Sequence, residues 1–507
     1  MRIDELLPCS VKLVKRIQKS NCDAVCIIDS EVPSELVDEF EQLSKFDKEF
    51  DSAVSCFKSL ILDLPIVYSR VPELTDYHDV RTYQQAAAKA LERAIKAGFE
   101  SPMLVVPASQ SFANTELCTV LGALHQLYVP IQLREDKPAE ARRVKKLSLL
   151  MTSPKAEDIL KEALLLESGR RIARDIGVGD PERMSPPRVE SYVNNALCSM
   201  NMKPIEDENA LARGFPLFYA INRAARQVPR HRGCIILLEY VPPKPARKTL
   251  MLVGKGVTYD TGGTDIQVGR VMAGKSRDKC GAAAVAGFMQ IVNEKKPADV
   301  HVMAALCMVR NSLGEESYVC DEIITSRAGV RVRVGSTDTE GPMCIADALC
   351  RFKEKAVEGK LPDPHLITIA TMTGHARLSA GDGYSIAIDN SVAHKAGHAR
   401  LLQATGQSFG EPFEVSMLRP DDFDFNKGKA IGEDIVQSNK TPSKQTKRGH
   451  QSPAAFLIQA TGLDKHGLGS KFPIKYTHID IAGSACVFPE MPTGAPIVAL
   501  AKTHLDT

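Results

Sequence analysis

Short runs of apolar, largely β-branched residues recur from about residue 181 onward, separated by helical or turn-rich stretches. The runs cover residues 234–238, 249–253, 300–305, 366–370 and 478–481. Such uninterrupted runs are typical of strands buried on both faces of a mainly parallel sheet. In these sheets functional groups gather beyond the carboxyl ends of the strands. The pattern predicts an α/β domain over residues 181–507 and directs attention to the segments that follow the runs.

The first 155 residues show the same alternation on a smaller scale. Apolar runs at residues 24–28 and 103–106 alternate with helical stretches at residues 84–97 and 116–127, which predicts a separate α/β domain. Residues 157–176 then carry apolar side chains at helical spacing, before the turn formers Gly177, Gly179, Asp180 and Pro181. We therefore expect two α/β domains, residues 1–155 and 181–507, joined by a helix over residues 156–180. The second domain should surround a mainly parallel mixed sheet.

The composition narrows the cellular compartment and the classes of binding partner that we expect for this protein. Because 64 Lys and Arg offset 62 Asp and Glu, no strong field would attract nucleic acid or an anionic membrane. Thirteen scattered cysteines without a Cys-x-x-Cys pair indicate a reducing compartment. No run approaches the roughly 18–20 apolar residues of a membrane span, and the amino terminus lacks the apolar stretch of a signal peptide. We expect a cytoplasmic protein with neither a nucleic-acid nor a membrane partner.

Two glycine-rich segments with acidic residues follow apolar runs. The first reads Val-Gly-Lys-Gly-Val-Thr-Tyr-Asp-Thr-Gly-Gly over residues 253–263, and a further aspartate, Asp278, precedes a small-residue helix at residues 281–287. The second reads Val-Gly-Ser-Thr-Asp-Thr-Glu-Gly over residues 334–341. We expect both segments to be loops. Their candidate ligands are Lys255, Asp260, Asp278, Asp338 and Glu340.

These side chains suit a pair of divalent cations. Three aspartates and a glutamate offer oxygen ligands, and bridging carboxylates commonly join two such ions. Lys255 can bind a metal only as the neutral amine, which requires a lowered pKa. A phosphate-binding loop is disfavoured because the glycine spacing fits neither the phosphate-loop nor the dinucleotide motif. The remaining alternative is that these segments are ordinary surface turns and that Lys255 forms an ion pair. This explanation would fit any one of the five residues, but it fits all five together much less well.

The two segments resemble the signature of the leucyl aminopeptidase family, also called cytosol aminopeptidases. That signature combines Gly-Lys-Gly-x-x-x-Asp-x-Gly-Gly with Asn-Thr-Asp-Ala-Glu-Gly-Arg. Residues 180–188, residues 368–374 with Thr-Met-Thr-Gly, and residues 480–483 look like further blocks of the family's catalytic domain. The resemblance covers roughly residues 170–500. The block at residues 180–188 looks closest to the aminopeptidase-like branch.

The resemblance implies a role for each of these positions. It makes Lys255, Asp260, Asp278, Asp338 and Glu340 the ligands of two divalent ions per chain, with Asp260 and Glu340 touching both. Zinc, manganese and magnesium all suit an oxygen-rich site with one nitrogen. The resemblance further implies a peptide substrate, a cleft around Thr373 and Gly374, and a homo-oligomer, in this family usually a hexamer.

Two positions depart from the family pattern. The family has a second lysine four residues beyond the Gly-Gly, where it donates to the substrate oxygen, and this chain has Gln267. The family follows its Glu-Gly with an arginine that holds a bicarbonate as the proton shuttle, and this chain has Pro342. Loss of one oxyanion donor typically costs about 10² to 10³ in rate, and loss of a general base about 10² to 10⁴.

Two functions are compatible with this pattern. The first is a metal-dependent aminopeptidase that removes N-terminal residues from peptides with weakened catalysis. The second is a non-catalytic, metal-binding member of the family with a structural or regulatory role. Four clustered carboxylates would repel one another without cations, so both hypotheses favour metal binding. Turnover of a peptide substrate distinguishes them.

Overall fold

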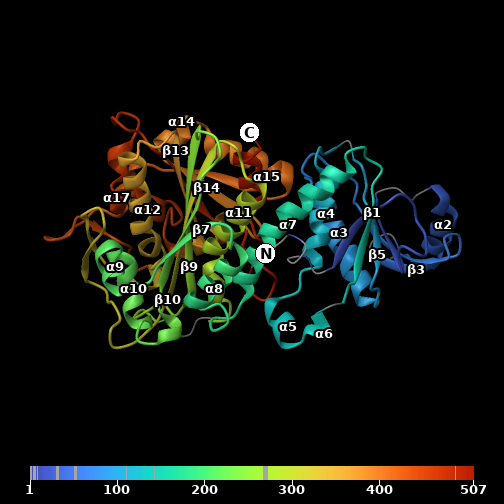
Figure 1. Cartoon of the computed structure of the whole chain (residues 1–507), viewed down its shortest axis with the longest axis horizontal. Coiled ribbons are helices and arrows are strands. Elements are labelled where there is room, and N and C mark those ends of the chain that lie inside the picture. The colour runs from blue at the N-terminus through green and yellow to red at the C-terminus, as the bar shows by residue number, and fades with distance from the viewer. Residues whose placement is uncertain are drawn as a thin grey trace. The chain divides into compact units, whose positions relative to one another are not determined.

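The computed structural model describes Ile3, Leu7 and residues 9–29, 34–48, 50, 54–109, 111–141, 143–266, 272–485 and 487–506. The chain forms two compact units (Figure 1). One contains the described residues up to Ser168 together with Gln407–Gly410, and the other contains Gly169–Gly406 and the described residues from Glu411 onward. The boundary at Ser168 falls inside α7 (Ala156–Val178), so this helix runs from one unit into the other.

The first unit is built on a six-stranded sheet in the order β1-β6-β5-β2-β4-β3. Its neighbours pair in parallel except β3 with β4. Phe40, Tyr68 and Met103 belong to a core cluster with Val25 and Ile27 of the central strand. The elements are β1 (Ser10–Val14), β2 (Ala24–Asp29), α2 (Val37–Phe46), β3 (Ser55–Ser59), β4 (Leu64–Arg70), α3 (Arg81–Lys96), β5 (Pro102–Val105), α4 (Thr115–Gln126), α5 (Ile131–Asp136), α6 (Pro138–Ala141) and β6 (Lys146–Leu150).

The second unit contains an eight-stranded mixed sheet in the order β15-β14-β17-β13-β9-β10-β8-β7. Its central strands β17, β13, β9 and β10 are parallel, whereas β14, β8 and β7 introduce antiparallel pairs. The predicted fold class is therefore confirmed. The strands are β7 (Asn201–Ile205), β8 (Cys234–Tyr240), β9 (Lys248–Asp260), β10 (Val300–Asn311), β13 (Pro364–Ala370), β14 (Ser385–Asp389), β15 (Phe413–Met417) and β17 (Lys475–Asp480).

Helices cover both faces of this sheet. In Figure 1, α12 and α17 lie on one side of the strands and α11 on the other. The helix α11 packs on β9, β10 and β13 and against α18, whereas α12 packs on β9 and β13 and against α10 and α17. The helices are α8 (Pro186–Ala196), α9 (Glu208–Gly214), α10 (Pro216–Ala225), α11 (Cys280–Lys295), α12 (Gly341–Glu358), α13 (Gly374–Ala380), α14 (Ser391–Lys395), α15 (His398–Phe409), α16 (Pro420–Phe425), α17 (Gln451–Thr461) and α18 (Ile497–His504). A separate three-stranded sheet contains β11 (Ile323–Thr325), β12 (Arg331–Arg333) and β16 (Ile435–Val436).

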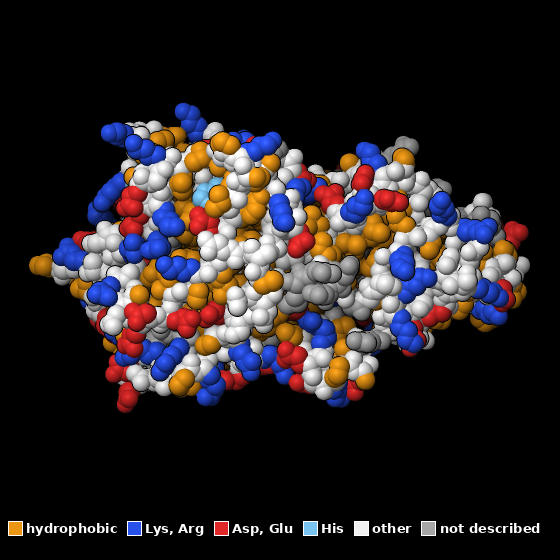
Figure 2. Space-filling view, in the orientation of Figure 1, with side chains coloured by type: hydrophobic (Ala, Val, Ile, Leu, Met, Phe, Trp, Pro, Cys, Tyr) orange, Lys and Arg blue, Asp and Glu red, His pale blue; other side chains and the backbone are white. Residues whose placement is uncertain are grey.

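The predicted strands and helices occur near their expected positions, and most of them are longer than expected. The linking helix continues through Gly177 to Val178, because a single glycine near a helix end costs only about 1 kcal/mol. Among the described residues, no helix is both long enough and apolar enough to cross a membrane. On the face shown in Figure 2, Lys and Arg side chains are interspersed with Asp and Glu.

Glycines let α11 approach the sheet closely. A Cβ atom on Gly254 of β9 would lie 2.5 Å from Cα of Ala282, and one on Gly281 would lie 2.2 Å from the carbonyl oxygen of Ile369 in β13. Both contacts are with backbone atoms, which cannot move aside as a side-chain tip can. The two glycines thus fix the start of α11 against the carboxyl-terminal half of two central strands.

We predict that Gly281→Ala destabilises the second unit, because α11 must move away from β13. Overpacking of this kind costs about 1–3 kcal/mol and should lower the melting temperature measured by thermal denaturation. Gly469→Ala is the matched control, since a Cβ there meets no atom within 4 Å. Equal melting temperatures for the two variants would contradict the close approach of helix and sheet.

Candidate metal centre

Strand β9 carries Lys255 and Asp260, which were expected from the sequence to lie in a loop. That expectation is wrong, because β9 continues in parallel pairing with β10 as far as Asp260 opposite Asn311. Residues five apart on a regular strand point to opposite faces. Here Val257 pairs with Val309 and Asp260 with Asn311, so β9 has one more residue than β10 in this interval. This bulge reverses the alternation and brings Lys255 and Asp260 to the same side.

The other acidic residues come from two short helical segments. Asp278 lies in the 3-10 helix Lys275–Lys279, directly before α11. Asp338 lies in the 3-10 helix Thr337–Thr339, and Glu340 is the N-cap residue of α12. The predicted second loop is thus largely helical. Its Gly341 approaches Lys255, because a Cβ there would lie 2.9 Å from Nζ.

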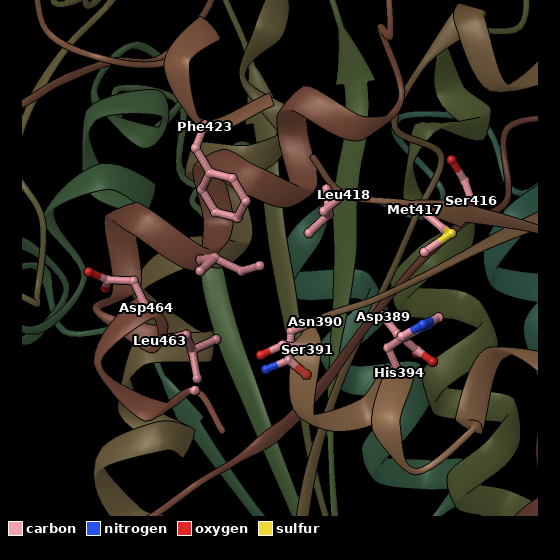
Figure 3. A pocket seen from close by; sticks show the side chains of 12 residues that line it. Asp389, Asn390, Ser391, His394, Ser416, Met417, Leu418, Phe423, Leu463 and Asp464 are labelled. Atoms are coloured by element: carbon pink, nitrogen blue, oxygen red, sulfur yellow. The ribbon is translucent and has the colours of Figure 1, made fainter. Parts of the chain in front are cut away.

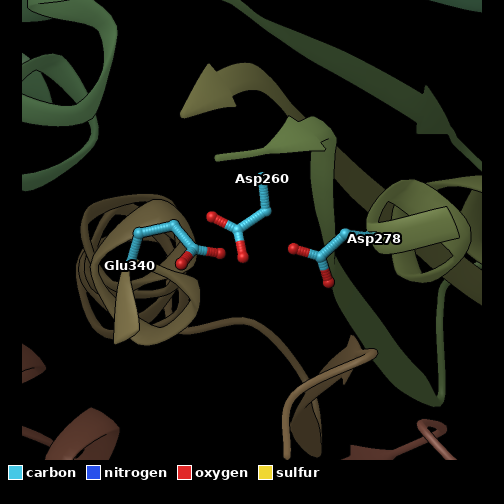
Figure 4. Close-up of side chains that lie close together, drawn as sticks. All are labelled: Asp260, Asp278 and Glu340. Carbon is cyan, nitrogen blue, oxygen red and sulfur yellow. The ribbon is translucent and has the colours of Figure 1, made fainter. Parts of the chain in front are cut away.

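Three of the predicted ligands form a compact cluster. Asp260, Asp278 and Glu340 each offer an oxygen atom, and these atoms lie within 4.8 Å of one another. In Figure 4, the carboxylate of Asp260 lies between those of Glu340 and Asp278. Burial and the charge of Asp260 raise the pKa of Glu340 well above its ordinary value. Burial also raises the pKa of Asp278. The three carboxylates therefore need positive charge close by.

Lys255 lies among these carboxylates and is 4% exposed. Its Nζ donates to Asp278 Oδ1 over 2.8 Å and to the carbonyl oxygen of Thr371 over 3.2 Å, and it lies 3.1 Å from Glu340 Oε1. Burial alone would lower the pKa of Lys255, but Asp278 and Glu340 outweigh burial and raise it. These contacts favour the ammonium form of Lys255, which partly neutralises the cluster.

The donor set fits divalent cations. Glu340 Oε1 is fully buried, and no described donor is directed at it in hydrogen-bonding geometry, although Lys255 Nζ is close. The one charge of Lys255 is shared among several carboxylates, so a divalent cation suits the negative charge that remains on this oxygen. Carboxylate oxygens are the preferred ligands of hard divalent ions.

Asp338 does not belong to the compact cluster of described ligands. Its side chain is half-buried, and its backbone N–H donates to Ser336 Oγ over 3.3 Å. The charge of Asp338 contributes to the raised pKa of Lys275, as do the charges of Asp260, Asp278 and Glu340. Asp338 therefore lies near the cluster and beside the same lysine.

Lys275 is a cation at this site that the sequence pattern did not indicate. Its Nζ lies 3.2 Å from Asp260 Oδ2, and its side chain is 30% exposed. Burial opposes its charge, but the four surrounding carboxylates raise its pKa. The available signal was its place three residues before Asp278, yet spacing alone cannot show which way a side chain points.

Two polar residues at strand ends were also missed. Asn311 ends β10, and its Nδ2 donates to Asp260 Oδ1 over 2.9 Å and to the carbonyl oxygen of Thr337 over 3.0 Å. Thr371 follows β13, and its hydroxyl donates to Asp278 Oδ1 over 2.8 Å. Both follow buried strands at the carboxyl end of the parallel sheet. That position is the signal that could have identified them.

Thr373 and Gly374 follow Thr371 at the same end of the sheet. The hydroxyl of Thr373 donates to Asp480 Oδ2 over 2.8 Å and accepts from the N–H of Ala376, which caps α13. The N–H of Gly374 donates to Ser443 Oγ over 3.1 Å. Burial raises the pKa of Asp480 to about 6, against the opposing effect of the Thr373 hydrogen bond. The side chain of Thr373 is therefore already bonded within the protein.

Of the two positions that depart from the family pattern, the structure describes Pro342 and not Gln267. Gln267 lies outside the described residues. Pro342 is buried in the first turn of α12, one residue after Gly341. Proline is favoured at that place because its missing N–H would have no partner within the helix and its fixed φ suits the first turn.

A hollow of about 450 Å³ lies at the opposite end of this sheet (Figure 3). It adjoins the carboxyl ends of β14 and β15, which run antiparallel to β17. Its lining includes Asp389, Met417, Leu418 and Phe423, and none of the predicted site residues. This hollow and the clustered carboxylates therefore do not coincide, and the chemistry of the side chains, not the hollow, identifies the candidate centre.

Comparison with known proteins identifies the family of the segment that carries these residues. The cytosol aminopeptidase family model for the catalytic domain matches residues 171–501. A Caenorhabditis elegans protein named as a putative aminopeptidase is 41% identical over 432 residues, covering 84% of this chain and 81% of that protein. A cytosol aminopeptidase of Vibrio cholerae is 26% identical over 397 residues, covering 75% of this chain and 71% of that protein.

The fold is also shared with a solved structure. Bottromycin maturation enzyme BotP in complex with Mn matches with a TM-score of 0.77 at 18% identity, covering 95% of this chain and 98% of that one. The matched family segment contains β9, the Lys275–Lys279 turn, α11 and the start of α12, and it spans more than half of the chain. The resemblance seen in the sequence is thereby confirmed: the chain belongs to the cytosol aminopeptidase family.

Proposed function

We propose that this protein is a metal-dependent aminopeptidase that removes N-terminal residues from peptides with weakened catalysis. The observation that carries the proposal is the cluster of Asp260, Asp278 and Glu340, whose carboxylate oxygens lie within 4.8 Å of one another beside Lys255. Membership of the family supports the reaction class. The cytoplasm as the location and a homohexamer as the assembly are proposals drawn from the same family resemblance.

Five residues would hold two divalent ions per chain: Lys255, Asp260, Asp278, Asp338 and Glu340. The manganese named for the BotP complex supports manganese, and zinc and magnesium also suit this donor set. Such ions, when bound, lower the pKa of a bound water and stabilise charge that develops on the substrate carbonyl. Lys255 would have to release its proton to serve as a ligand.

The chain's own residues supply the remaining groups of the site. Lys275 places an ammonium group 3.2 Å from Asp260, so a positive charge lies at the edge of the cluster although the family's lysine is replaced by Gln267. The free amine of a peptide suits the surrounding carboxylates. Thr373 is fixed by Asp480, and we propose that the Thr373–Gly374 backbone lines the substrate cleft.

The alternative is a non-catalytic, metal-binding member of the family. Pro342 favours it, because this buried residue offers no side-chain donor where the family's arginine holds the proton shuttle. Lys275 favours residual catalysis, because it offers a cation close to Asp260. Losses of groups that act in one step are not additive, so the turnover rate must be measured.

We predict that the purified protein binds about two divalent ions per chain and that chelation lowers its melting temperature, because a ligand that binds only the folded state stabilises it. Elemental analysis after loading with manganese or zinc measures the stoichiometry. Asp260→Asn and Glu340→Gln should reduce it most, since the family resemblance implies that each of these residues touches both ions and each change would weaken both sites at once. A stoichiometry near zero without a thermal shift would exclude a metal centre.

We further predict that metal affinity rises with pH. Asp278 and Glu340 hold the pKa of Lys255 above its ordinary value, so Lys255 is charged at neutral pH and must lose a proton to bind a metal. Fewer protons compete for the ligands as pH rises. Calorimetric titration in two buffers of different ionisation enthalpy measures the protons released. A binding constant that does not change with pH would contradict Lys255 as a ligand.

The third prediction concerns Gln267 and Pro342. With metal content matched, Gln267→Lys together with Pro342→Arg should raise kcat for a leucyl amide by more than either change alone, because oxyanion donor and proton shuttle act in the same step. The unmodified protein and both single variants are the controls. If the double variant binds two metals and stays as slow as the unmodified protein, the non-catalytic alternative is favoured.

A further inference from the structure

A second hollow lies at the end of the sheet opposite the candidate metal centre. It has a volume of about 220 Å³ and adjoins the amino ends of β9, β13 and β17, three parallel neighbours. Drug-sized ligands occupy pockets of about 300–1,000 Å³, so this hollow suits a smaller molecule. None of its lining residues belongs to the proposed metal centre, so ligand binding here does not depend on peptidase activity.

Basic side chains dominate its wall. Among the described lining residues, six are basic or imidazole groups: Arg247, Lys248, His365, His398, Lys475 and His504. Asp363 is the one carboxylate in that lining, and Lys475 Nζ lies 2.7 Å from it. Outside the lining, Asp299 accepts from Arg247 Nε over 3.0 Å. The described wall therefore carries more positive than negative charge.

Three buried imidazoles form a hydrogen-bonded chain at this wall. Thr477 Oγ1 donates its proton to Asp389 Oδ1 over 2.6 Å. It must therefore accept from His365 Nε2 at 3.0 Å and His398 Nδ1 at 2.9 Å. His398 Nε2 lies 3.1 Å from His504 Nε2.

This chain fixes the tautomers when the three rings are neutral. His398 then presents a bare Nε2, so His504 must donate from its own Nε2. The second ring nitrogens of His365 and His504, both named Nδ1, carry no proton in this state. Each of them can gain one, which would make the ring a cation at the wall of the hollow.

Protonation of Lys248, His365 and His504 is less favourable in the structure than in water. Burial and the neighbouring Arg247 lower the pKa of Lys248 to about 8. Burial, together with the other imidazoles, Lys248 and Lys475, lowers the pKa values of His365 and His504 well below the ordinary value. Like charges gathered around a small hollow repel one another, and an anion inside it would offset this repulsion.

We propose that this hollow binds a small tetrahedral oxyanion, of the sulfate or phosphate type, through Lys248, His365 and His504. Lys475 and Arg247, which pair with Asp363 and Asp299, contribute further positive charge. A charged donor and an anionic acceptor form the stronger class of hydrogen bond. Such an anion favours the protonated form of the groups around it, so binding takes up protons and weakens as pH rises.

Isothermal titration of the full-length protein with sodium sulfate tests this proposal, because sulfate itself does not titrate in this range. At constant ionic strength we expect binding at about pH 6.5 to be about tenfold tighter than at about pH 8.5. Lys248, with its pKa of about 8, loses its proton over this interval, and a bound anion raises the pKa values of the two histidines toward it. Comparison of two buffers should show net proton uptake. Inorganic phosphate should compete with sulfate for the site.

Two variants and a matched control locate the bound anion. Lys248→Gln and His504→Gln should each weaken sulfate binding about tenfold and reduce the proton uptake. Lys244→Gln removes the same charge from an exposed position four residues earlier, and it should leave affinity within about twofold.

Three results would overturn the proposal. The first is the absence of sulfate binding at millimolar concentrations. The second is an equal effect of the Lys244 and Lys248 substitutions, which would show that net charge alone attracts the anion. The third is loss of binding in Glu340→Gln with retention in Lys248→Gln, which would place the anion at the candidate metal centre. Failure of peptide turnover affects none of these readouts.

Discussion

Mutual repulsion among buried carboxylates is the constraint around which the second unit is arranged. Asp260, Asp278 and Glu340 place oxygen atoms within 4.8 Å of one another. Because little water reaches these oxygen atoms, the repulsion between their charges is only weakly screened. Lys255 and Lys275 supply the opposite charge within the described residues of this site. Two ammonium groups cannot balance four acidic groups once Asp338 is counted, and the proposed divalent ions would supply the remaining positive charge.

Strand β9 decides whether this cluster can form. Its extra residue between the pairs Val257–Val309 and Asp260–Asn311 turns Lys255 and Asp260 to one side. Gly254 meanwhile lets the start of α11, which follows Asp278, approach the strand. A regular strand would separate the lysine from the aspartate, and a side chain at residue 254 would push Asp278 away. The ligand set thus depends on backbone geometry as much as on the ligands themselves.

The same parallel strands carry opposite charge at their two ends. Carboxylates gather beyond the carboxyl end of β9, whereas Lys248, His365 and Lys475 surround the hollow at the amino ends of β9, β13 and β17. The family relationship accounts for the first site and gives no reason for the second. Conversely, Pro342 stands within the proposed ligand segment, at the position where the family resemblance implies an arginine.

The sequence alone determined the α/β class, the approximate strands and helices, and the family, because apolar periodicity and ligand spacing are local properties of the chain. It also suggested the candidate ligands, in loops that were expected to follow buried strands: Lys255, Asp260, Asp278, Asp338 and Glu340. Residues 255–260 were mistaken for a loop, because glycines are common in turns. The structure shows instead that glycine is needed here where a neighbouring helix and strand pack closely. Lys275, Asn311 and Thr371 were missed, since the direction of a side chain depends on segments far away in sequence. Only the tertiary structure decided that a bulge opposite β10 aligns the lysine with the aspartate. It alone also showed that histidines from β13, α15 and α18 form a hydrogen-bonded chain that begins at one threonine. Both arrangements arise from contacts between segments that no local pattern relates.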